Sequence, residues 1–332
     1  MKNRLLFPII FAFIFAFIFS ACSNFSGNED EVEASLKPGP VAKQKKEAEE
    51  EEDTPTTRTY YDLNGITFGN NTFVAVGDKG AVLTSSDNGS SWDNGTSGTT
   101  RELYEIAYGD QTFVTVGQRG TNLYSSDNGT TWSSGTTSEN SNYYGVTNGN
   151  NAFVALGSSN LLKSTDNGSN WNIIGEGLDG INVAFGSSRF VVCGAKGAIL
   201  FTTDNGEGWS TGMSGASSTT FSGITFGNNQ FFSVGSSGKL IKSINNGSSW
   251  STVDSTVTKS LYSIVFGNST FVGVGYKTVI VSTDNGSTFI EKENTLTFND
   301  VTFGNGVFVA VGDDEIIYTS TDGDDWTKVY GK

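Results

Sequence analysis

One pattern of hydrophobic and polar positions repeats along the chain from about residue 60 to its end. In the unit GITFGNNTFVAVGDKGAVLTSSDNGSSW (residues 65–92), apolar segments alternate with short runs of Gly, Asn, Asp and Ser. YSIVFG (residues 262–267) alternates and predicts a half-buried strand, whereas the continuously apolar FVAVG (residues 73–77) predicts a strand covered on both faces. The GNN, glycine-bounded and DNG segments between them are typical of tight turns. Each unit is therefore predicted to form four antiparallel strands.

Each unit ends on an aromatic residue, at intervals of 40, 39, 38, 41, 39 and 37 residues. Residues 59–332 comprise 274 residues, or about 39 for each of seven units, which is the length of a four-stranded propeller blade. We predict an all-β, monomeric, seven-bladed β-propeller of four-stranded blades, closed by packing of blade 7 on blade 1. Whether the segment before Leu63 adds a strand to blade 7 stays open. The closing aromatic residues are Trp92, Trp132, Trp171, Trp209, Trp250, Phe289 and Trp326.

The segments SSDNGSSW (residues 85–92), STDNGSNW (residues 164–171) and TTDNGEGW (residues 202–209) resemble the Asp-box, or BNR, repeat S-x-D-x-G-x-x-W. That repeat occurs in sialidases, sortilin-type receptors, some glycoside hydrolases and photosystem II assembly factor propellers. Asn245 and Phe289 depart from the pattern, and residues 320–326 are one residue shorter. The resemblance implies the propeller fold. The polar residues at the central position are Asp87, Asp127, Asp166, Asp204, Asn245, Asp284 and Asp322.

Elementary chemistry gives these central residues a structural role. An Asp side chain accepts hydrogen bonds from backbone N–H groups of its own turn, the following Gly takes a positive φ, and the aromatic residue packs between strands. Each turn offers one carboxylate, whereas Ca²⁺ needs several oxygen ligands. We therefore expect no metal and no cofactor.

The amino-terminal region predicts an export signal. Two basic residues precede an apolar run of about 15 residues, too short for a permanent membrane span, which ends in small residues. The junction FSAC resembles the lipobox of bacterial lipoproteins, although Phe19 stands where Leu is usual. We predict a signal peptide over residues 1–21, lipidation at Cys22 and an acidic, flexible tether over residues 22–58. Ordinary secretion is the alternative. The outer membrane or the cell surface is favoured over the inner membrane.

Composition excludes several function classes. The net charge is 20 − 35 = −15, which argues against nucleic acid as the partner. The chain has no histidine, so catalysis by Ser-His-Asp or Cys-His sites and most zinc sites are excluded. Besides Cys22 the chain has only Cys193, which lies where other units have valine and is expected in the core.

The turn after the second strand of each unit is a candidate binding position, because these seven turns are expected on one face of the ring. Four of the seven residues are cationic in a body with 13 basic and 25 acidic residues. The alternative is that long polar side chains merely solvate the turns. The seven residues are Lys79, Arg119, Ser159, Lys196, Ser237, Lys277 and Asp314.

On the same face, closure of the ring is expected to bring Asp313, Asp314 and Glu315 near Asp78. A pair of these carboxylates is what glycoside hydrolysis requires. The short units leave little room for a substrate cleft, and the chain has no FRIP motif of sialidases. We therefore favour a non-enzymatic binding or assembly scaffold for an envelope protein, a host protein or a glycan, with a glycoside hydrolase as the alternative.

Overall fold

The computed structural model describes residues 60–137, 140–158, 160–176, 180–203, 205–212, 214–215, 218–293 and 295–332. The predicted signal peptide, Cys22 and the tether lie outside these residues, as do Thr59, Ser159 and Asp204. Within the described residues, no helix is long and apolar enough to span a membrane.

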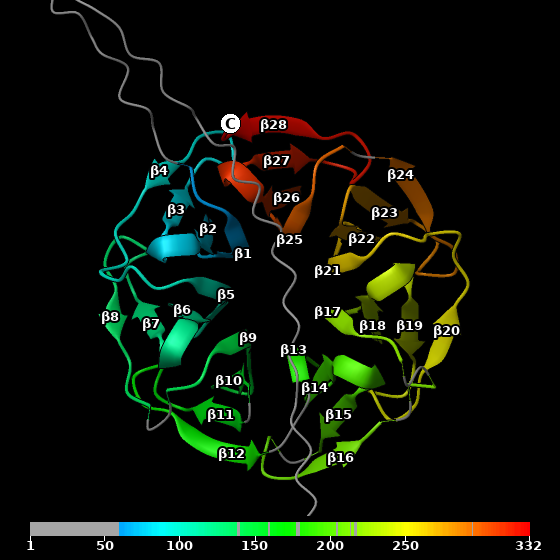
Figure 1. Ribbon diagram of the computed structural model, residues 1–332, viewed down its shortest axis with the longest axis horizontal. Helices are drawn as coiled ribbons and strands as arrows, with labels where there is room; N and C mark the ends of the chain where they lie inside the picture. Colours follow the sequence, from blue (N-terminus) through cyan, green and yellow to red (C-terminus); the bar gives the residue numbers. More distant parts are fainter. Residues whose placement is uncertain are drawn as a thin grey trace, which may run out of the picture. The chain divides into compact units, whose positions relative to one another are not determined.

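The described residues form seven antiparallel four-stranded sheets arranged as the blades of one ring (Figure 1). Each sheet takes four consecutive strands, so every blade is contiguous in sequence. Helical structure in the described part consists of five three-residue 3-10 turns. The predicted seven-bladed propeller is confirmed.

The strands fall into four sets, from the axis outward. The inner strands are β1 (Leu63–Gly69), β5 (Leu103–Gly109), β9 (Tyr143–Gly149), β13 (Gly180–Gly186), β17 (Phe221–Gly227), β21 (Leu261–Gly267) and β25 (Phe298–Gly304). The second strands are β2 (Thr72–Gly77), β6 (Thr112–Gly117), β10 (Ala152–Gly157), β14 (Arg189–Gly194), β18 (Gln230–Gly235), β22 (Thr270–Gly275) and β26 (Val307–Gly312).

The third strands are β3 (Val82–Ser85), β7 (Asn122–Ser125), β11 (Asn160–Ser164), β15 (Ile199–Thr202), β19 (Leu240–Ser243), β23 (Thr278–Ser282) and β27 (Ile317–Ser320). The outer strands are β4 (Asp93–Asn94), β8 (Ser133–Ser134), β12 (Asn172–Glu176), β16 (Trp209–Thr211), β20 (Ser251–Val253), β24 (Ile290–Glu293) and β28 (Thr327–Tyr330). The 3-10 turns are η1 (Asp78–Gly80), η2 (Gln118–Gly120), η3 (Ala195–Gly197), η4 (Ser236–Gly238) and η5 (Asp313–Glu315).

The second strands form the core because neighbouring blades cover both of their faces. Five of them, β2, β6, β10, β18 and β22, are buried along their whole length. Each hydrophobic cluster joins side chains of adjacent blades; for example, Trp171 of blade 3 packs with Val114 and Val116 of blade 2. Cys193 lies fully buried in β14, and burial raises the pKa of its thiol to about 12. Its predicted place in the core is confirmed.

Blade 7 closes the ring on blade 1 by the predicted face packing. Leu63 and Phe73 of blade 1 share one buried cluster with Val309 and Val311 of blade 7. The described residues 60–62, which precede Leu63, form no strand; the Tyr61 carbonyl accepts a hydrogen bond from the Glu315 N–H of the η5 turn at 2.9 Å. Whether earlier residues add a strand to blade 7 lies outside the described residues.

Close approach between blades requires glycine at the end of each inner strand. A Cβ at Gly69 would lie 2.0 Å from Cγ of Tyr108 in the next blade, and a Cβ at Gly304 would lie 2.1 Å from Cγ of Phe68. The aromatic ring of each following blade covers this glycine, except that blade 3 supplies Asn148. The Phe-Gly pair that recurs at the end of the inner strands therefore sets the distance between blades, because the glycine of one blade lies against the aromatic ring of the next.

The turns between third and outer strands, which we call the Asp turns, are closed by their own side chains. Asp87 Oδ1 accepts hydrogen bonds from the Ser91 N–H at 2.9 Å and from the Ser85 hydroxyl at 2.8 Å. The Trp92 indole N–H donates to the Gly89 carbonyl at 3.1 Å, and Gly89 has φ +81°. Hydrogen bonds from Ser91 and Ser85 lower the pKa of Asp87 to about 2. The Asp87 side chain thus closes its own turn.

The departures from the repeat keep this geometry. Asn245 Oδ1 accepts the Ser249 N–H at 2.9 Å, so an amide replaces the carboxylate without loss of the turn bond. In the shorter turn of blade 7, Asp322 Oδ1 accepts the N–H groups of Asp324 and Asp325 at 2.9 and 3.1 Å. Phe289 has no indole N–H, but it is buried against Phe232 with ring centroids 5.8 Å apart.

Candidate functional site

The turns after the second strands lie on one face of the ring (Figure 1) and share one backbone path. Their second residue has positive φ in every described case, between 52° and 56°, and each is exposed. These residues are the predicted binding positions Lys79, Arg119, Lys196, Ser237, Lys277 and Asp314.

Backbone groups of these second residues contact the segments that enter the inner strands of their own blade and of the next blade. The Arg119 N–H donates to Asn142 Oδ1 at 2.9 Å, and the Arg119 carbonyl accepts from the Arg101 guanidinium at 3.1 Å. The Lys277 carbonyl accepts from Lys259 Nζ at 2.9 Å. The side chains stay on the surface, and their role in partner binding remains a prediction.

Two of the predicted cations lie over aromatic rings. Lys79 Nζ lies 5.4 Å from the ring centroid of Tyr61, and Lys277 Nζ lies 5.4 Å from that of Tyr276. Such cation–π contacts orient a long side chain without neutralising it. Arg189 contacts the Asn246 carbonyl and Ser248 of a neighbouring Asp turn, which places it on the opposite face, away from Arg101 and Arg119.

In the turns of blades 1 and 7, the first residue, one position before the predicted binding position, contacts an inner strand. Asp78 Oδ1 accepts from the Asn64 amide at 3.0 Å, and Asp313 Oδ1 accepts from the Asn299 amide at 3.1 Å. The same asparagine amides donate to backbone carbonyls of the neighbouring inner strand, Leu103 and Leu63. The predicted binding positions are the second turn residues, whereas in these two turns the side chain of the first residue is the one that contacts the inner strand.

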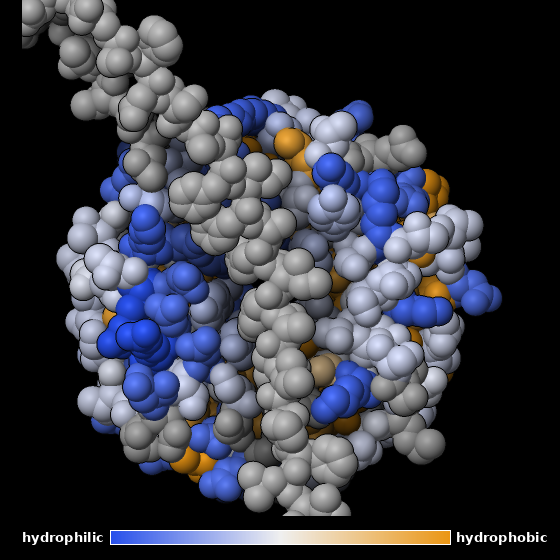
Figure 2. All heavy atoms as spheres, in the orientation of Figure 1, coloured by the Kyte–Doolittle hydropathy of each residue, from blue (hydrophilic) through white to orange (hydrophobic). Residues whose placement is uncertain are grey.

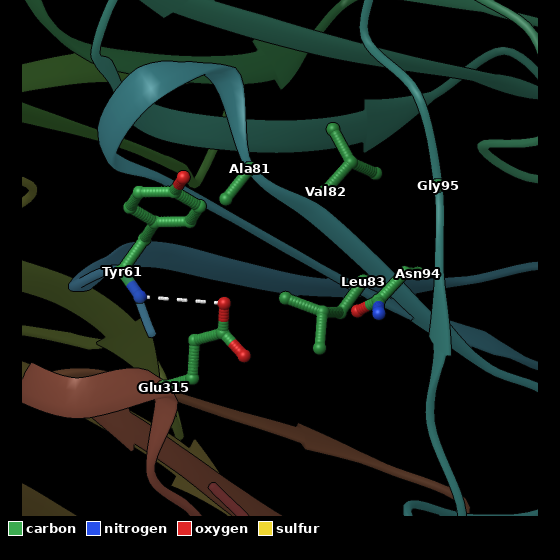
Figure 3. Close-up of a pocket in the computed structure, with 7 residues that line it drawn as sticks. All are labelled: Tyr61, Ala81, Val82, Leu83, Asn94, Gly95 and Glu315. Atoms are coloured by element: carbon green, nitrogen blue, oxygen red, sulfur yellow. Dashed lines mark hydrogen bonds between the residues drawn. The ribbon is translucent and has the colours of Figure 1, made fainter. Parts of the chain in front are cut away.

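The structure divides the four carboxylates considered for the hydrolase alternative. Asp78 and Asp313 lie near each other beside the inner strands, whereas the backbone N–H of Asp314 donates to Asp62 Oδ1 at 2.9 Å. Glu315 turns away into a cavity of about 280 Å³ at the junction of blades 7 and 1, where its carboxylate accepts the Tyr61 N–H at 3.3 Å (Figure 3). Of the four carboxylates, Glu315 is the one whose side chain the structure separates from Asp78 and Asp313.

Glu315 occupies a strained backbone position. Its φ is +57°, and four equivalent turns carry glycine there, namely Gly80, Gly120, Gly197 and Gly238. The side chain is only 4% exposed and lies against Tyr61 in the cavity (Figure 3). We interpret this residue as a bridge that fixes the start of the propeller to blade 7.

Acidic neighbours and partial burial disfavour the charged form of Asp78. Burial is the largest cause that raises its pKa, the hydrogen bond from Asn64 opposes it, and the charges of Glu102, Asp62 and Asp313 raise the pKa further. The inner ends of blades 7, 1 and 2 are therefore a locally negative part of this face.

Tyrosines form the other part of the same surface. Tyr104 and Tyr144 of neighbouring blades stack with ring centroids 5.5 Å apart, and the Tyr104 hydroxyl donates to Glu102 Oε2 at 2.7 Å. Tyr144 is 40% exposed and Tyr276 is 49% exposed, which is unusual for large side chains. The pKa of Tyr262 is raised by burial, by Asp313 and by Tyr276.

We call this surface the axial rim. It combines aromatic faces, which are enriched at protein-binding surfaces, with carboxylates that favour basic groups. Sequence reasoning missed the tyrosines, although the second position of the inner strand, in LYEIAYG, YYGVTNG and LYSIVFG, carries the signal. The axial rim comprises Asp78, Glu102, Asp313, Tyr104, Tyr144, Tyr262 and Tyr276.

Two buried carboxylates lie one position deeper in the inner strands and were also missed. Asp300 Oδ2 accepts the Ile66 N–H of the next blade at 2.8 Å, and Glu105 Oε1 accepts the Ile106 N–H at 2.9 Å. Burial raises the pKa of Asp300 to about 6, and burial with the charge of Asp300 raises that of Glu105. The equivalent residues of blades 1, 3 and 5 are glycines, so these acids are additions to the common unit.

No family model matches the chain, and no curated protein matches its sequence. Solved structures do resemble it. YCF48 from Cyanidioschyzon merolae is 19% identical, with a TM-score of 0.64 over 78% of this chain and 95% of that chain. YCF48 bound to D1 peptide is 16% identical, with a TM-score of 0.64 over 79% and 92% of the two chains. The WD40 propeller domain of Doa1 is 11% identical, with a TM-score of 0.62 over 79% and 93%. At these identities the likeness shows the propeller fold.

Proposed function

We propose that the protein is an exported, lipid-anchored Asp-box propeller that acts as a non-enzymatic binding or assembly scaffold, with the axial rim as its contact surface. The observation that carries the proposal is the stack of half-buried Tyr104 on exposed Tyr144, beside Glu102. Exposed aromatic rings gain most from burial against a partner, and adjacent carboxylates select its basic groups. The YCF48 structure bound to D1 peptide supports a peptide or protein partner, since it has the same fold. A glycan partner is the second choice.

The predicted cations suit a larger partner surface. Lys79, Arg119, Lys196 and Lys277 are exposed on the same face as the axial rim. A partner with a basic or aromatic segment at the rim and acidic residues around it would meet both sets of charges. Electrostatic complementarity of this kind mainly sets specificity and association rate, and it weakens with salt.

Capture of envelope proteins by the full chain in detergent tests the rim. Tyr144→Ala and Tyr276→Ala are expected to reduce stoichiometric capture by roughly tenfold each, because each removes an exposed aromatic anchor. Ile290→Ala is the matched control, since Ile290 is 60% exposed but lies on the outer strand β24. Equal losses in all three variants would reject the rim as the contact surface.

Anchoring through Cys22 is tested separately. Cys22→Ser is expected to abolish lipid labelling and to move the protein from the membrane fraction to the soluble fraction. If the variant stays with membranes, the apolar amino-terminal segment or another contact holds the protein, and the lipid anchor is rejected.

A glycoside hydrolase is the second candidate function, favoured by the proximity of Asp78 and Asp313 and by the raised pKa of Asp78. This function requires that the protein turn over a glycan and that Asp78→Asn abolish the turnover. The scaffold requires stoichiometric binding without turnover, and binding should survive Asp78→Asn better than Tyr144→Ala.

A further inference from the structure

Two carboxylates of the axial rim lack a cationic partner. Asp78 and Glu102 lie close enough to interact as like charges. Among the residues that the structure describes, neither of them takes part in an ion pair. Both are half-buried, where water screens charge less than it does on an open surface. A cation placed beside them would therefore offset an unfavourable interaction.

Each of these carboxylates has a cation next to it in the sequence, but both cations contact other groups. Lys79 Nζ lies over the ring of Tyr61, 5.4 Å from its centroid. The Arg101 guanidinium donates to the Arg119 carbonyl at 3.1 Å. Figure 2 shows the hydrophilic residues gathered over blades 1 and 2 on this face. The chain thus carries cations near the rim without pairing them with its carboxylates, which remain available to a cation from a partner.

Each carboxylate has one bonded oxygen and one open oxygen. Asp78 Oδ1 accepts from the Asn64 amide at 3.0 Å. Glu102 Oε2 accepts from the Tyr104 hydroxyl at 2.7 Å. No described residue donates a hydrogen bond to Asp78 Oδ2 or to Glu102 Oε1. The bonded oxygens orient the two side chains, and the open oxygens can accept hydrogen bonds from a ligand.

An aromatic platform adjoins these open oxygens. The rings of Tyr104 and Tyr144 are stacked at an interplanar angle of 28°, and Tyr144 is 40% exposed. Burial, and then its hydrogen bond to Glu102, raise the pKa of Tyr104, and the nearby charge of Asp78 raises it further. Tyr104 therefore keeps its proton and continues to donate to Glu102. The result is a flat π surface with carboxylate oxygens at its edge.

A guanidinium group matches this combination better than an ammonium group does. It is planar, so it stacks on an aromatic ring while its N–H groups, which lie in the same plane, donate to carboxylates at the edge of the ring. An ammonium group is a strongly hydrated point charge that has no plane to stack. The rim therefore favours arginine over lysine.

We infer that the axial rim binds an arginine side chain of the partner protein. Its guanidinium stacks on Tyr144 and donates to the open oxygen of Glu102, and Asp78 supplies the second negative charge. The inference deepens the proposed function and rests on it, because it names the residue type that the scaffold selects.

The rest of the rim favours a polypeptide as the source of this arginine. Tyr262 and Tyr276 belong to blade 6, which lies across the ring axis from blades 2 and 3 (Figure 1). Tyr276 is 49% exposed. One arginine side chain cannot cover both groups of tyrosines, whereas a polypeptide segment that carries the arginine can cross the face from one group to the other.

Isothermal titration of the full chain in detergent with the peptide acetyl-Gly-Arg-Gly-amide tests the inference. Citrulline in place of arginine keeps the shape but removes the charge, and it is expected to lower the affinity by roughly tenfold, the size of one lost charge-assisted bond. Lysine in place of arginine keeps the charge but removes the plane, and it is expected to lower the affinity by roughly fivefold.

Variants of the rim separate charge from stacking. Glu102→Gln keeps an acceptor for the Tyr104 hydroxyl but removes the charge, so it should weaken arginine binding by roughly tenfold. Glu207→Gln is the matched control, because Glu207 pairs with Lys163 in an Asp turn on the opposite face and its loss changes the net charge equally.

Stacking has a signature of its own. Arginine side-chain CH₂ protons are expected to shift upfield in NMR spectra when they lie over a tyrosine ring. The shift should persist in Tyr144→Phe and vanish in Tyr144→Leu, and Tyr144→Leu should also remove the preference for arginine over lysine. Thermal melts of each variant establish that it is folded before binding is compared.

Several outcomes would overturn the inference. Equal binding of the citrulline and arginine peptides would show that charge is not recognised, and equal binding of the lysine peptide would show that the plane is not recognised. Equal losses in Glu102→Gln and Glu207→Gln would assign the effect to net charge. Tighter binding of free arginine than of the peptide would identify a small-molecule site. Absence of saturable binding up to about 10 mM peptide would also reject the site.

This inference and the proposed function fail in different ways. If Tyr144→Ala abolishes capture of an envelope protein while Glu102→Gln leaves capture unchanged, arginine recognition is rejected and the axial rim stands. If the arginine peptide binds as expected but the full chain captures no envelope protein, the scaffold is rejected instead.

Discussion

The two faces of the ring use their turn residues in opposite ways. On one face, the polar side chains of the Asp turns accept hydrogen bonds from the backbone of their own turn. Nearly the same hydrogen bonds recur from Asp87 to Asp322. On the other face, the turns after the second strands share a backbone path but carry Lys, Arg, Ser or Asp, and their backbone groups contact segments of their own blade and of the next blade. The recurring residues therefore specify the fold, and the residues that vary between units mark the face where binding is expected.

The largest effect is expected from the aromatic residue of an Asp turn. Trp171 is buried against blade 2, and its indole N–H donates to the Gly168 carbonyl at 2.9 Å. Trp171→Ala should lower the free energy of unfolding by about 3–5 kcal/mol, as for other truncated core aromatics. Chemical denaturation measures this change, and a loss below 1 kcal/mol would show that the turn does not hold the blades together.

Charge reversal on the opposite face is expected to change binding and not stability. Arg119→Glu with Lys196→Glu should lower the affinity for a captured partner by roughly tenfold, and the loss should depend markedly on ionic strength. The control pair is Lys163→Glu with Lys242→Glu; both lysines lie on third strands, and their amino groups contact Glu207 and the Gly286 carbonyl. Equal losses from both pairs would mean that net charge governs association, and the predicted ring would be abandoned.

A smaller loss is expected from the carboxylate of the same Asp turn. Asp166 Oδ1 accepts the Asn170 N–H at 2.9 Å in an exposed turn, so Asp166→Ala should cost about 1 kcal/mol. Asp166→Asn should cost less, because Asn245 makes the equivalent bond in blade 5. Unfolding with and without a chelator checks both the loss and the expectation that no metal is involved.

The pH dependence of stability should carry two opposite signs, each of modest size. Hydrogen bonds lower the pKa of Asp87 and Asp284 to about 2. The contribution of these two carboxylates to stability is therefore present above the unfolded pKa of about 4 and is lost as pH falls toward 2. Burial raises the pKa of Asp300 to about 6, so its contribution is full below about pH 4 and is lost as pH rises through 6. Thermal melts of wild type and Asp300→Asn test this, since the variant should show a flatter profile between pH 4 and 6.

The repeat along the chain was enough to predict the number of blades and the order of their strands. A strand that is apolar on both faces requires cover from both sides, and a period near 39 residues provides it by repetition. Local hydrogen bonds within a turn depend on neighbours in the chain, so Asp87 and Trp92 could be assigned their roles from spacing alone. The Phe-Gly pair could be seen in the sequence, but only its contacts with the neighbouring blade show that it sets the distance between blades.

Which residues come into contact on the face of the axial rim could be seen only in the folded structure. Contacts between blades join positions about 40 residues apart, such as Tyr104 with Tyr144, and closure of the ring joins Ile66 with Asp300 across most of the chain. The direction of each side chain at a turn follows from backbone dihedral angles, which placed Asp78 and not Lys79 against the inner strand. Residue type alone does not reveal that direction, because a polar side chain at a turn can be solvated on either side of the backbone.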